Sequence, residues 1–198
     1  MSRLVDIALA LSAAICLSPL VLLIAVAVRL DLGSPVLFRQ RRAGLGGIEF
    51  DIVKFRTMRD TRDSAGRLLP DAERVVPLGR LLRRTRLDEL PELLNILRGD
   101  MSFVGPRPLL PETIRVFGEK GVLRGRVRPG LTGWSQVNGN TLLTQEEKLE
   151  LDLWYLANRT LFMDAAVMLR TLAVMTFGEQ RNSDNLEKAF ASSRHRRG

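Results

Sequence analysis

The chain has 198 residues, of which 45% are hydrophobic and 26% are charged, and its formal net charge is +8. This apolar content is sufficient for a buried core, so the composition excludes a mostly disordered chain. A single cysteine and a single histidine exclude a disulfide scaffold, a cysteine-built zinc site and a histidine-based triad, so any chemistry depends on carboxylates, lysine, arginine or a hard cation.

The first predicted element is an uncharged run over residues 7–28, which as a straight helix measures roughly 33 Å and is long enough to cross a bilayer. Pro19 has no N–H for the Ile15 carbonyl, so we expect a kink, and we expect the Ser18 hydroxyl to bond the Ala14 carbonyl. Arginines flank both ends, so a spanning helix and a re-entrant helix both remain open. In either case the basic excess after the run places the globular part in the cytoplasm.

A β-hairpin is predicted after the apolar helix. Residues 36–40 and 48–55 have strand composition and flank the glycine-rich turn 44–47. We interpret this turn as a hairpin turn, and a phosphate cradle is the alternative. The polar residues 60–71 predict a loop.

Two helices are predicted next. Leu78, Leu81 and Leu82 share one side of a short helix whose other side is arginine-rich, a pattern typical of a helix at a membrane surface. A plain surface helix on a soluble core is the alternative. A second helix is predicted over 87–98, with Pro91 in its first turn, so two acidic residues fall at its N-terminus.

The C-terminal half predicts a rigid turn and two further helices. Proline and glycine define the turn at 105–108. A helix over 144–157 begins with a candidate capping box, and an apolar helix over 161–177 is a candidate for lying at the membrane. The remaining residues, 178–198, predict a polar, basic and mobile tail.

Asp88 and Glu89 are the candidate catalytic carboxylates. Acidic residues at a helix start are ordinary, because they complement the helix dipole. A carboxylate near several arginines, however, stays ionised and is a potential nucleophile, and Mg²⁺ is suited to bridging it to phosphate oxygens.

Arg107 is the candidate phosphate clamp, because prolines on both sides fix its backbone. A structural arginine that pairs with a carboxylate is the alternative. Only four of the 30 basic residues are lysine, and arginine offers a planar fork suited to phosphate. Anionic lipid, nucleic acid, phosphorylated substrates and a merely solvated basic face all remain open. Lys54, taken alone, is most simply a surface residue.

Four ordered motifs give the chain a family resemblance. They are Lys54–Met58, Leu87–Pro91, Gly99–Pro108 and Arg128–Gly133. With these motifs the chain resembles the bacterial sugar transferase family over residues 2–177. It is most similar to the small monotopic polyprenyl-phosphate phosphoglycosyl transferases in their minimal catalytic form.

The resemblance implies an α+β, membrane-associated fold in three parts. Residues 1–32 would form a re-entrant helix whose break is at Ser18 and Pro19. Residues 33–177 would form a compact cytoplasmic catalytic domain with a small β-hairpin and amphipathic interfacial helices, and 178–198 would form the polar basic tail. The implied location is the inner membrane, with the catalytic domain facing the cytoplasm.

The resemblance also implies an activity and a set of site residues. Such enzymes move sugar-1-phosphate from a UDP-sugar to a polyprenyl phosphate such as undecaprenyl phosphate, in the first membrane step of a glycoconjugate or polysaccharide pathway. Asp88 would be the nucleophile that forms a covalent phosphosugar intermediate and a ligand of the required Mg²⁺, and Glu89 would assist it. The implied substrate- and phosphate-binding residues are Lys54, Arg107, Arg128, Gln136 and Asp152. The implied partners are the donor, the lipid acceptor and a phospholipid membrane, and not nucleic acid.

One position departs from the family pattern. Many relatives have arginine where this chain has Asn140, which leaves the identity of the sugar open. The alternative to an enzyme is a non-enzymatic, membrane-anchored module that binds anionic lipid or nucleic acid. Such a module would be indifferent to Asp88→Asn, and its binding would weaken steeply with salt.

Overall fold

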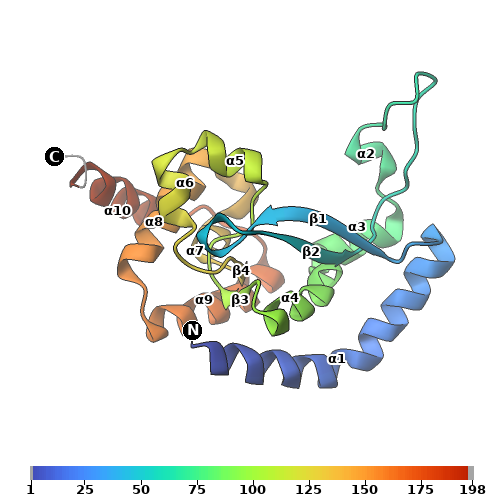
Figure 1. The fold of residues 1–198 in the computed structure, drawn as a ribbon, viewed down its shortest axis with the longest axis horizontal. Coiled ribbons are helices and arrows are strands. Elements are labelled where there is room, and N and C mark those ends of the chain that lie inside the picture. The colour runs from blue at the N-terminus through green and yellow to red at the C-terminus, as the bar shows by residue number, and fades with distance from the viewer. Residues whose placement is uncertain (1, 196–198) are drawn as a thin grey trace.

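A computed structural model describes residues 2–195 as a helix-rich body with two small sheets, arranged above one long helix, α1 (Arg3–Leu32) (Figure 1). The strands are β1 (Leu37–Ala43), β2 (Glu49–Phe55), β3 (Ser102–Val104) and β4 (Gly130–Thr132), and the 3₁₀ turns are η1 (Leu45–Gly47), η2 (Leu87–Glu92) and η3 (Asn140–Leu142). The other helices are α2 (Asp71–Arg74), α3 (Pro77–Thr85), α4 (Leu93–Arg98), α5 (Pro111–Val116), α6 (Glu119–Arg124), α7 (Trp134–Val137), α8 (Gln145–Asn158), α9 (Leu161–Phe177) and α10 (Ser183–His195).

α1 is the one helix among the described residues that is long and apolar enough to cross a membrane. It contains Pro19, and it bends near its middle in Figure 1. The Ser18 hydroxyl donates to the Ile15 carbonyl at 2.8 Å, and not to Ala14 as predicted. Ile15 is the residue whose carbonyl loses its partner through the missing N–H of Pro19, so the hydroxyl satisfies the acceptor that the proline leaves free.

The N-terminal end of α1 is fixed to the globular part by buried polar contacts. The Arg3 guanidinium donates to the Leu97 carbonyl at 2.7 Å. Asp6 is only 2% exposed, and its Oδ1 accepts from the Ser102 hydroxyl at 2.9 Å and from the Phe103 N–H at 3.1 Å. A carboxylate buried in this way is stable only where hydrogen bonds satisfy it, so these contacts fix where α1 begins.

The C-terminal end of α1 is fixed to the same body. The Arg56 guanidinium donates to the Leu32 carbonyl at 3.2 Å, and Arg59 lies 3.4 Å from the Asp31 carboxylate. Between the two ends, Ala10, Ile24 and Val28 are buried against the globular part. α1 therefore contacts the body at both ends and along one side, while much of its surface stays exposed.

The predicted hairpin is confirmed. β1 and β2 pair antiparallel from Leu37↔Phe55 to Ala43↔Glu49. The glycine-rich segment between them is the hairpin turn, closed by a hydrogen bond from the Gly44 N–H to the Ile48 carbonyl at 2.8 Å. The buried side chains of β2 pack toward α1 and α4, which gives the hairpin its place over the long helix.

β3 and β4 form a short parallel pair that the sequence did not predict. The two strands bring the motif 99–108 beside the motif 128–133. A Cβ added at Gly130 would lie 2.1 Å from the Gly105 nitrogen, so only glycine allows this approach. The close contact holds the turn 105–108 firmly against β4.

The helix predicted over 87–98 is two elements, η2 and α4. Arg86 has a left-handed backbone, with φ +56°, and Pro91 lies within the 3₁₀ turn. The leucines of residues 87–98 have the spacing of a buried apolar stripe, but Leu94 is 46% exposed, while Glu92 is only 2% exposed. The polar contacts of this segment override its leucine pattern.

The C-terminal helices agree with the prediction up to Phe177. α8 begins with the expected capping box between Thr144 and Glu147, and α9 has the expected bounds. The tail differs from the prediction, because residues 183–195 form α10, and Leu186 and Ala189 of α10 are buried in the core. Residues 196–198 of the predicted tail lie outside the described residues.

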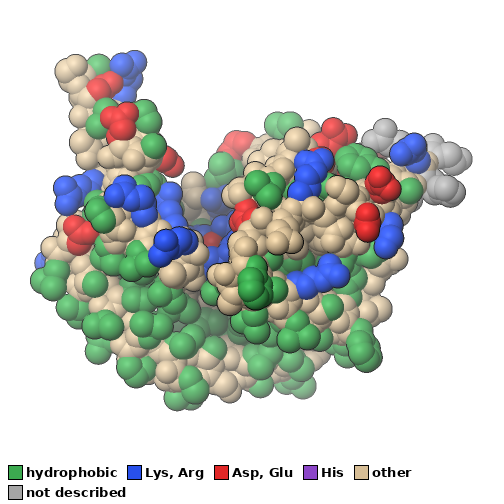
Figure 2. All heavy atoms as spheres, turned by 180° about the vertical axis from the view of Figure 1, so that it is seen from behind, with side chains coloured by type: hydrophobic (Ala, Val, Ile, Leu, Met, Phe, Trp, Pro, Cys, Tyr) green, Lys and Arg blue, Asp and Glu red, His purple; other side chains and the backbone are tan. Residues whose placement is uncertain are grey.

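Large apolar side chains are exposed along α1 and α9, which lie on the lower side of the molecule in Figure 1. Figure 2 shows them gathered over the lower half of the surface, with lysine and arginine above. We call this surface the apolar face; its principal residues are Leu4, Leu11, Ile15, Leu22, Leu23, Leu30, Leu161, Phe162, Leu169, Leu172, Met175 and Phe177. An apolar surface of this extent is typical of contact with a membrane or a partner.

Candidate active site

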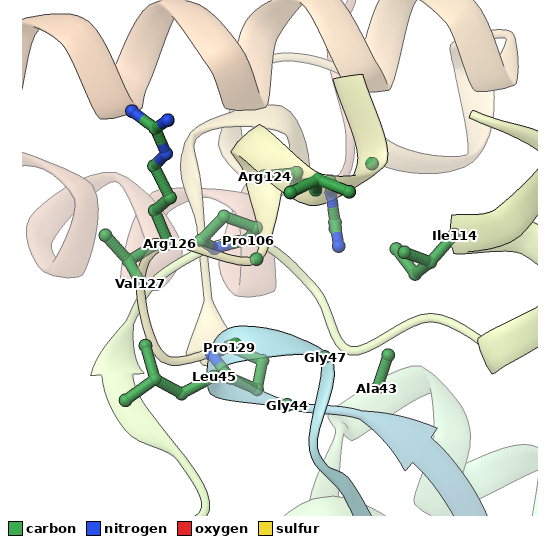
Figure 3. A pocket seen from close by; sticks show the side chains of 14 residues that line it. Ala43, Gly44, Leu45, Gly47, Pro106, Ile114, Arg124, Arg126, Val127 and Pro129 are labelled. Carbon is green, nitrogen blue, oxygen red and sulfur yellow. The ribbon is translucent and has the colours of Figure 1, made fainter. Parts of the chain in front are cut away.

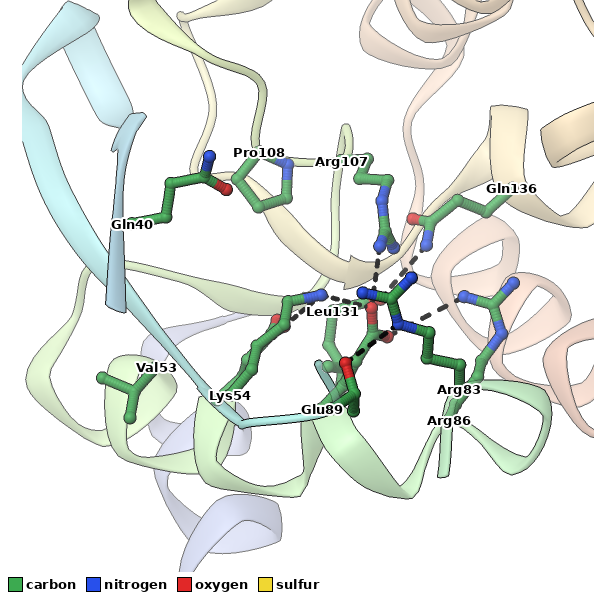
Figure 4. A network of polar contacts seen from close by, with 12 residues as sticks. Gln40, Val53, Lys54, Arg83, Arg86, Glu89, Arg107, Pro108, Leu131 and Gln136 are labelled. Carbon is green, nitrogen blue, oxygen red and sulfur yellow. Dashed lines mark hydrogen bonds and ion pairs between the residues drawn. The ribbon is translucent and has the colours of Figure 1, made fainter. Parts of the chain in front are cut away.

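Glu89 is at the centre of the candidate site. Lys54 Nζ from β2 lies 2.6 Å from Glu89 Oε1, and Arg107 Nη2 from the turn after β3 lies 2.7 Å from the same oxygen. Arg86 Nη1 lies 3.8 Å from Oε2. Figure 4 shows these cations converging on the carboxylate. Burial favours the neutral acid, but Arg107 and Lys54 outweigh it and lower the pKa of Glu89 to about 2.

Glu92 is a further carboxylate that sequence reasoning missed. Its Oε1 lies 3.1 Å from Lys54 Nζ, so one lysine serves two carboxylates. Burial raises the pKa of Glu92 to about 7, with Lys54 opposing the rise and the charge of Glu89 adding to it. The available signal was its place three residues after Glu89, on the same side of a helical turn.

Asp88 is buried at 8% exposure but is not neutralised. Within residues 2–195, no lysine or arginine forms an ion pair with its carboxylate. Burial and the charge of Glu89 raise the pKa of Asp88, while Lys54 and Arg83 oppose that shift. Asp88 is therefore the carboxylate of this cluster that is free to react or to bind a ligand, and its burial opposes the ionised form that was expected from the nearby arginines.

Two arginines of the α3–η2 segment lie beside the site. Arg83 Nε donates to the Thr57 hydroxyl at 3.0 Å, and Arg86 points toward Glu89. Several arginines were expected near the two carboxylates from the sequence, and the positions of Arg83 and Arg86 agree with that expectation. Arg86 is the residue between α3 and η2, and its left-handed backbone, with φ +56°, changes the chain direction there.

Arg124 connects two predicted site residues that do not contact each other. Its Nε lies 2.8 Å from Asp152 Oδ2, and its Nη2 donates to the backbone carbonyl of Arg107 at 2.5 Å. Both members of the Arg124–Asp152 pair are almost fully buried. The sequence did not single out Arg124, since its partners are distant in the chain.

Arg128 and Gln136, two further predicted site residues, each donate to a backbone carbonyl instead of contacting Glu89. Arg128 Nε donates to the Gly99 carbonyl at 2.8 Å, so it holds two motifs together. Gln136 Nε2 donates to the Leu131 carbonyl at 3.3 Å, and its Oε1 is buried without a hydrogen-bond partner. Asp152 Oδ1 is likewise buried and unpartnered. Buried acceptors without partners are uncommon and suit a donor supplied by a ligand.

These acceptors belong to a polar cavity of about 240 Å³ that opens beside Arg107. Its polar lining includes Arg107, Arg124, Ser135, Gln136, Asn140, Thr141, Gln145, Lys148 and Asp152. A second cavity of about 370 Å³ lies between the hairpin turn and the 121–129 segment (Figure 3). The second cavity is mostly apolar, whereas the polar cavity is lined by Arg107, which also contacts Glu89, so the polar cavity is the better candidate for a charged substrate.

A magnesium ion fits the site only as a partner of substrate phosphate. Among residues 2–195, no group of three or more His, Cys, Asp or Glu is arranged to hold a metal ion. Glu89 and Glu92 are engaged by Lys54, which leaves Asp88 as the available ligand. Mg²⁺ is commonly held by one or two carboxylates together with substrate phosphates, so this donor set is compatible with it.

The fold and site define a class of protein: a helix-rich α+β body with one long apolar helix, an apolar face and a cluster of buried carboxylates and cations. The model of the bacterial sugar transferase family matches residues 1–178. The chain belongs to the bacterial sugar transferase family.

Curated relatives agree with this assignment. The chain is 46% identical over 179 residues to an uncharacterized sugar transferase, EpsL, of Bacillus subtilis (strain 168), covering 90% of this chain and 89% of that protein. It is 38% identical over 180 residues to the UDP-glucose:undecaprenyl-phosphate glucose-1-phosphate transferase of Caulobacter vibrioides, covering 86% of this chain and 67% of that one. It is 38% identical to the Escherichia coli (strain K12) protein of the same name, covering 87% of this chain but only 39% of that protein.

Proposed function

We propose that this protein transfers sugar-1-phosphate from a UDP-sugar to a polyprenyl phosphate at the inner membrane, through a covalent intermediate on Asp88. The observation that supports this most directly is a buried, unpaired carboxylate beside a set of fixed cations. The names of the curated relatives include UDP-sugar donors and undecaprenyl phosphate. A non-enzymatic binding module would have no use for this carboxylate.

The proposed reaction has two in-line steps at one phosphorus. An oxygen of Asp88 attacks the β-phosphorus of the donor; the bond to the bridging oxygen breaks, and its electron pair leaves with UMP. A phosphate oxygen of the lipid then attacks the same phosphorus, and the bond to Asp88 breaks, which regenerates the carboxylate. Each step forms one P–O bond and breaks one, and neither requires a proton.

The cations have separate proposed roles. Arg107 and Lys54 would contact the diphosphate as charge moves to the leaving oxygen, since both are fixed before the substrate arrives. Glu89 would hold these two cations in place and would stay ionised across the working pH range. When bound by Asp88 and the donor, Mg²⁺ would neutralise phosphate charge.

We assign the donor to the polar cavity beside Arg107. Its buried acceptors, Gln136 Oε1 and Asp152 Oδ1, suit hydroxyl or N–H groups of the nucleotide or sugar. Relatives at similar identity are named for glucose and for N-acetylgalactosamine, so the sugar is a matter for direct measurement.

The test is a set of UDP-sugars supplied with undecaprenyl phosphate and scored by UMP release. We expect Asp88→Asn to reduce release by at least three orders of magnitude, because amide nitrogen and oxygen cannot replace the nucleophile. Asp71→Asn, on an exposed residue of α2, is the matched control and should retain full turnover.

The covalent step has its own measurement. Donor alone should give one equivalent of UMP and a phosphosugar adduct on the peptide that contains Asp88, and initial rates should follow a ping-pong pattern. An adduct on another residue, intersecting initial-rate lines, or full turnover by Asp88→Asn would each reject this mechanism.

We further propose that α1 is re-entrant, entering and leaving the membrane on the cytoplasmic side. The support is that both ends of α1 contact one globular body, through Arg3 and Asp6 at the start and Leu32 at the end. A straight transmembrane helix would place these ends on opposite sides of the bilayer.

Labelling of a cysteine at position 2 tests this topology. The variant Ser2→Cys is made with the exposed native thiol removed by Cys16→Ala. Ser64→Cys, on the exposed arm before α2, serves as the cytoplasmic reference. We expect both cysteines to react with an impermeant reagent from the same side of inner-membrane vesicles, and reaction of Ser2→Cys from the opposite side would establish a spanning helix.

A further inference from the structure

A carboxylate between α9 and α10 reaches the edge of the active site. Glu179 lies one residue beyond the segment matched by the family model, and it is half-buried although both of its sequence neighbours are exposed. Its Oε1 lies 3.3 Å from Arg86 Nη2 and also accepts from the Asn140 side chain. Its Oε2 accepts from the Thr141 N–H at 3.0 Å and from the Thr141 hydroxyl.

Arg86 is shared between Glu179 and the catalytic cluster. One guanidinium nitrogen lies 3.3 Å from Glu179, and the other lies 3.8 Å from Glu89 Oε2. Arg86 is also the left-handed residue between α3 and η2, two positions before Asp88. The direction of the Arg86 side chain therefore depends on a residue outside the four sequence motifs.

Glu179 also fixes one wall of the polar cavity. Asn140 and Thr141 line that cavity, and Asn140 has φ +41°, a conformation that a non-glycine residue rarely adopts without support. The preceding Asn138 is held from the same segment, since Asn182 N–H donates to its backbone carbonyl at 3.1 Å and Asn185 donates to its side chain at 2.7 Å.

We propose that Glu179 is a positioning residue for donor binding. It holds Arg86 over the catalytic carboxylates and holds residues 140–141 at the wall of the donor cavity, so that one side chain joins the two halves of the donor site. The proposal rests on the proposed function, because it assigns this cavity to the UDP-sugar. A carboxylate is required, since it accepts four hydrogen bonds or ion-pair contacts at once.

The test compares Glu179→Gln with Arg181→Gln by steady-state kinetics with UDP-sugar. Arg181 is on the same segment, but its ion pair is with Glu147 at the exposed start of α8, so its loss leaves the active site untouched. We expect Glu179→Gln to raise the donor KM about tenfold, the effect of losing roughly one charge-assisted hydrogen bond. The KM for the lipid acceptor should not change, and Arg181→Gln should match the unmodified chain in both constants.

A double-mutant cycle with Arg86→Gln separates positioning from general stabilisation. The donor KM of Glu179→Gln/Arg86→Gln should rise by less than the product of the two single-variant changes, because both substitutions remove the same Arg86–Glu179 ion pair. Additive effects, an equal rise in both KM values, or a donor KM within twofold of the Arg181→Gln control would overturn the assignment. Absence of UMP release by the unmodified chain would instead refute the proposed function itself.

Discussion

Three acidic residues in one 3₁₀ turn have three different states. Asp88 is unpaired, Glu89 is held by cations that lower its pKa to about 2, and Glu92 is buried so deeply that its pKa rises to about 7. The difference arises because Lys54 is shared by Glu89 and Glu92, while Arg107 contacts Glu89. One segment thus supplies a reactive carboxylate, an anchor for cations and a titratable group.

Because burial raises the pKa of Glu92, we predict that the folded protein loses stability as pH rises. Its pKa is raised from 4.5 in the unfolded chain to about 7 in the folded protein, so the folded state binds more protons, and stability falls as pH rises from about 4.5 through 7. Glu92→Gln removes this loss. We expect the Tm difference, variant minus parent, to increase by on the order of 5 °C between pH 5 and pH 8.5.

Thermal unfolding from pH 5 to pH 8.5 measures this difference. Glu89 does not interfere, because its lowered pKa makes it a stabilising carboxylate whose contribution is lost only below pH 4.5, toward pH 2. Glu112→Gln, which removes an exposed carboxylate of α5, is the control and should give a flat difference. A flat difference for Glu92→Gln as well would show that Glu92 is ionised throughout.

At the scale of elements, we predict that Pro19 determines whether α1 is re-entrant or spans the membrane. Arg3–Leu32 as a straight helix would be about 45 Å long, more than a bilayer core requires, whereas the two arms on either side of Pro19 are each about half that length. Pro19→Ala restores the missing N–H and removes the cause of the bend. We expect a substantial fraction of Ser2→Cys molecules to become accessible from the opposite face, with parallel loss of activity.

Ser18→Ala is the matched control for that change. It removes the hydroxyl that satisfies the Ile15 carbonyl but keeps the proline, so we expect unchanged topology and a modest loss of stability, about 1 kcal/mol. Labelling of Ser2→Cys from both sides of membrane vesicles measures each variant. If Pro19→Ala keeps the labelling pattern of its parent, the contacts of Arg3 and Asp6, and not the bend, determine topology.

The elements also indicate how far the sequence determines this structure. The hairpin, α3, α8 and α9 were predictable because their signals are local: strand composition around a glycine-rich turn, leucine spacing, a capping box and an apolar run. The parallel β3–β4 pair was not, since its strands have only three residues each and depend on a close glycine contact. α10 was missed because its buried side chains are few within a polar segment.

The site divides in the same way. Asp88, Glu89 and Arg107 were identified from their motifs, whereas Lys54 taken alone suggested a surface residue until its motif was included. Arg124 was missed because its side-chain partner, Asp152, is far along the chain, and the local signal of Glu92, its spacing from Glu89, does not reveal its contact with Lys54. Long-range ion pairs of this kind leave no periodic signal in a single sequence.

At the scale of the whole molecule, the apolar face and the charged residues lie on different parts of the surface. α1 and α9 present large exposed apolar side chains on one side, while lysine and arginine lie above them (Figure 2). A membrane at the apolar face would place a lipid phosphate near the carboxylate cluster and leave the donor cavity open to water. Under the proposed function, the face would therefore serve the lipid acceptor and not the soluble donor.

This arrangement predicts that substitutions in α9 separate the two substrates. Phe162 is 91% exposed and Leu169 is 69% exposed on the apolar face. Placing a carboxylate there, in Phe162→Asp or Leu169→Asp, would oppose contact of α9 with a membrane and leave the apolar side chains of α1 unchanged. With polyprenyl phosphate in vesicles, we expect the acceptor KM to rise on the order of tenfold, the loss of part of one buried apolar side chain, and the donor KM to stay constant.

Val116→Asp is the control, because Val116 is 84% exposed on α5, on the side of the molecule away from α1 (Figure 1). It adds the same charge to an equally exposed apolar position, yet it should change neither KM. With a short, water-soluble polyprenyl phosphate, the acceptor KM values of all three variants should become more similar, since the enzyme then does not need to bind a membrane to reach the acceptor. If Val116→Asp impairs use of the vesicle-bound acceptor as strongly as Leu169→Asp does, net charge and not the apolar face governs access to the lipid.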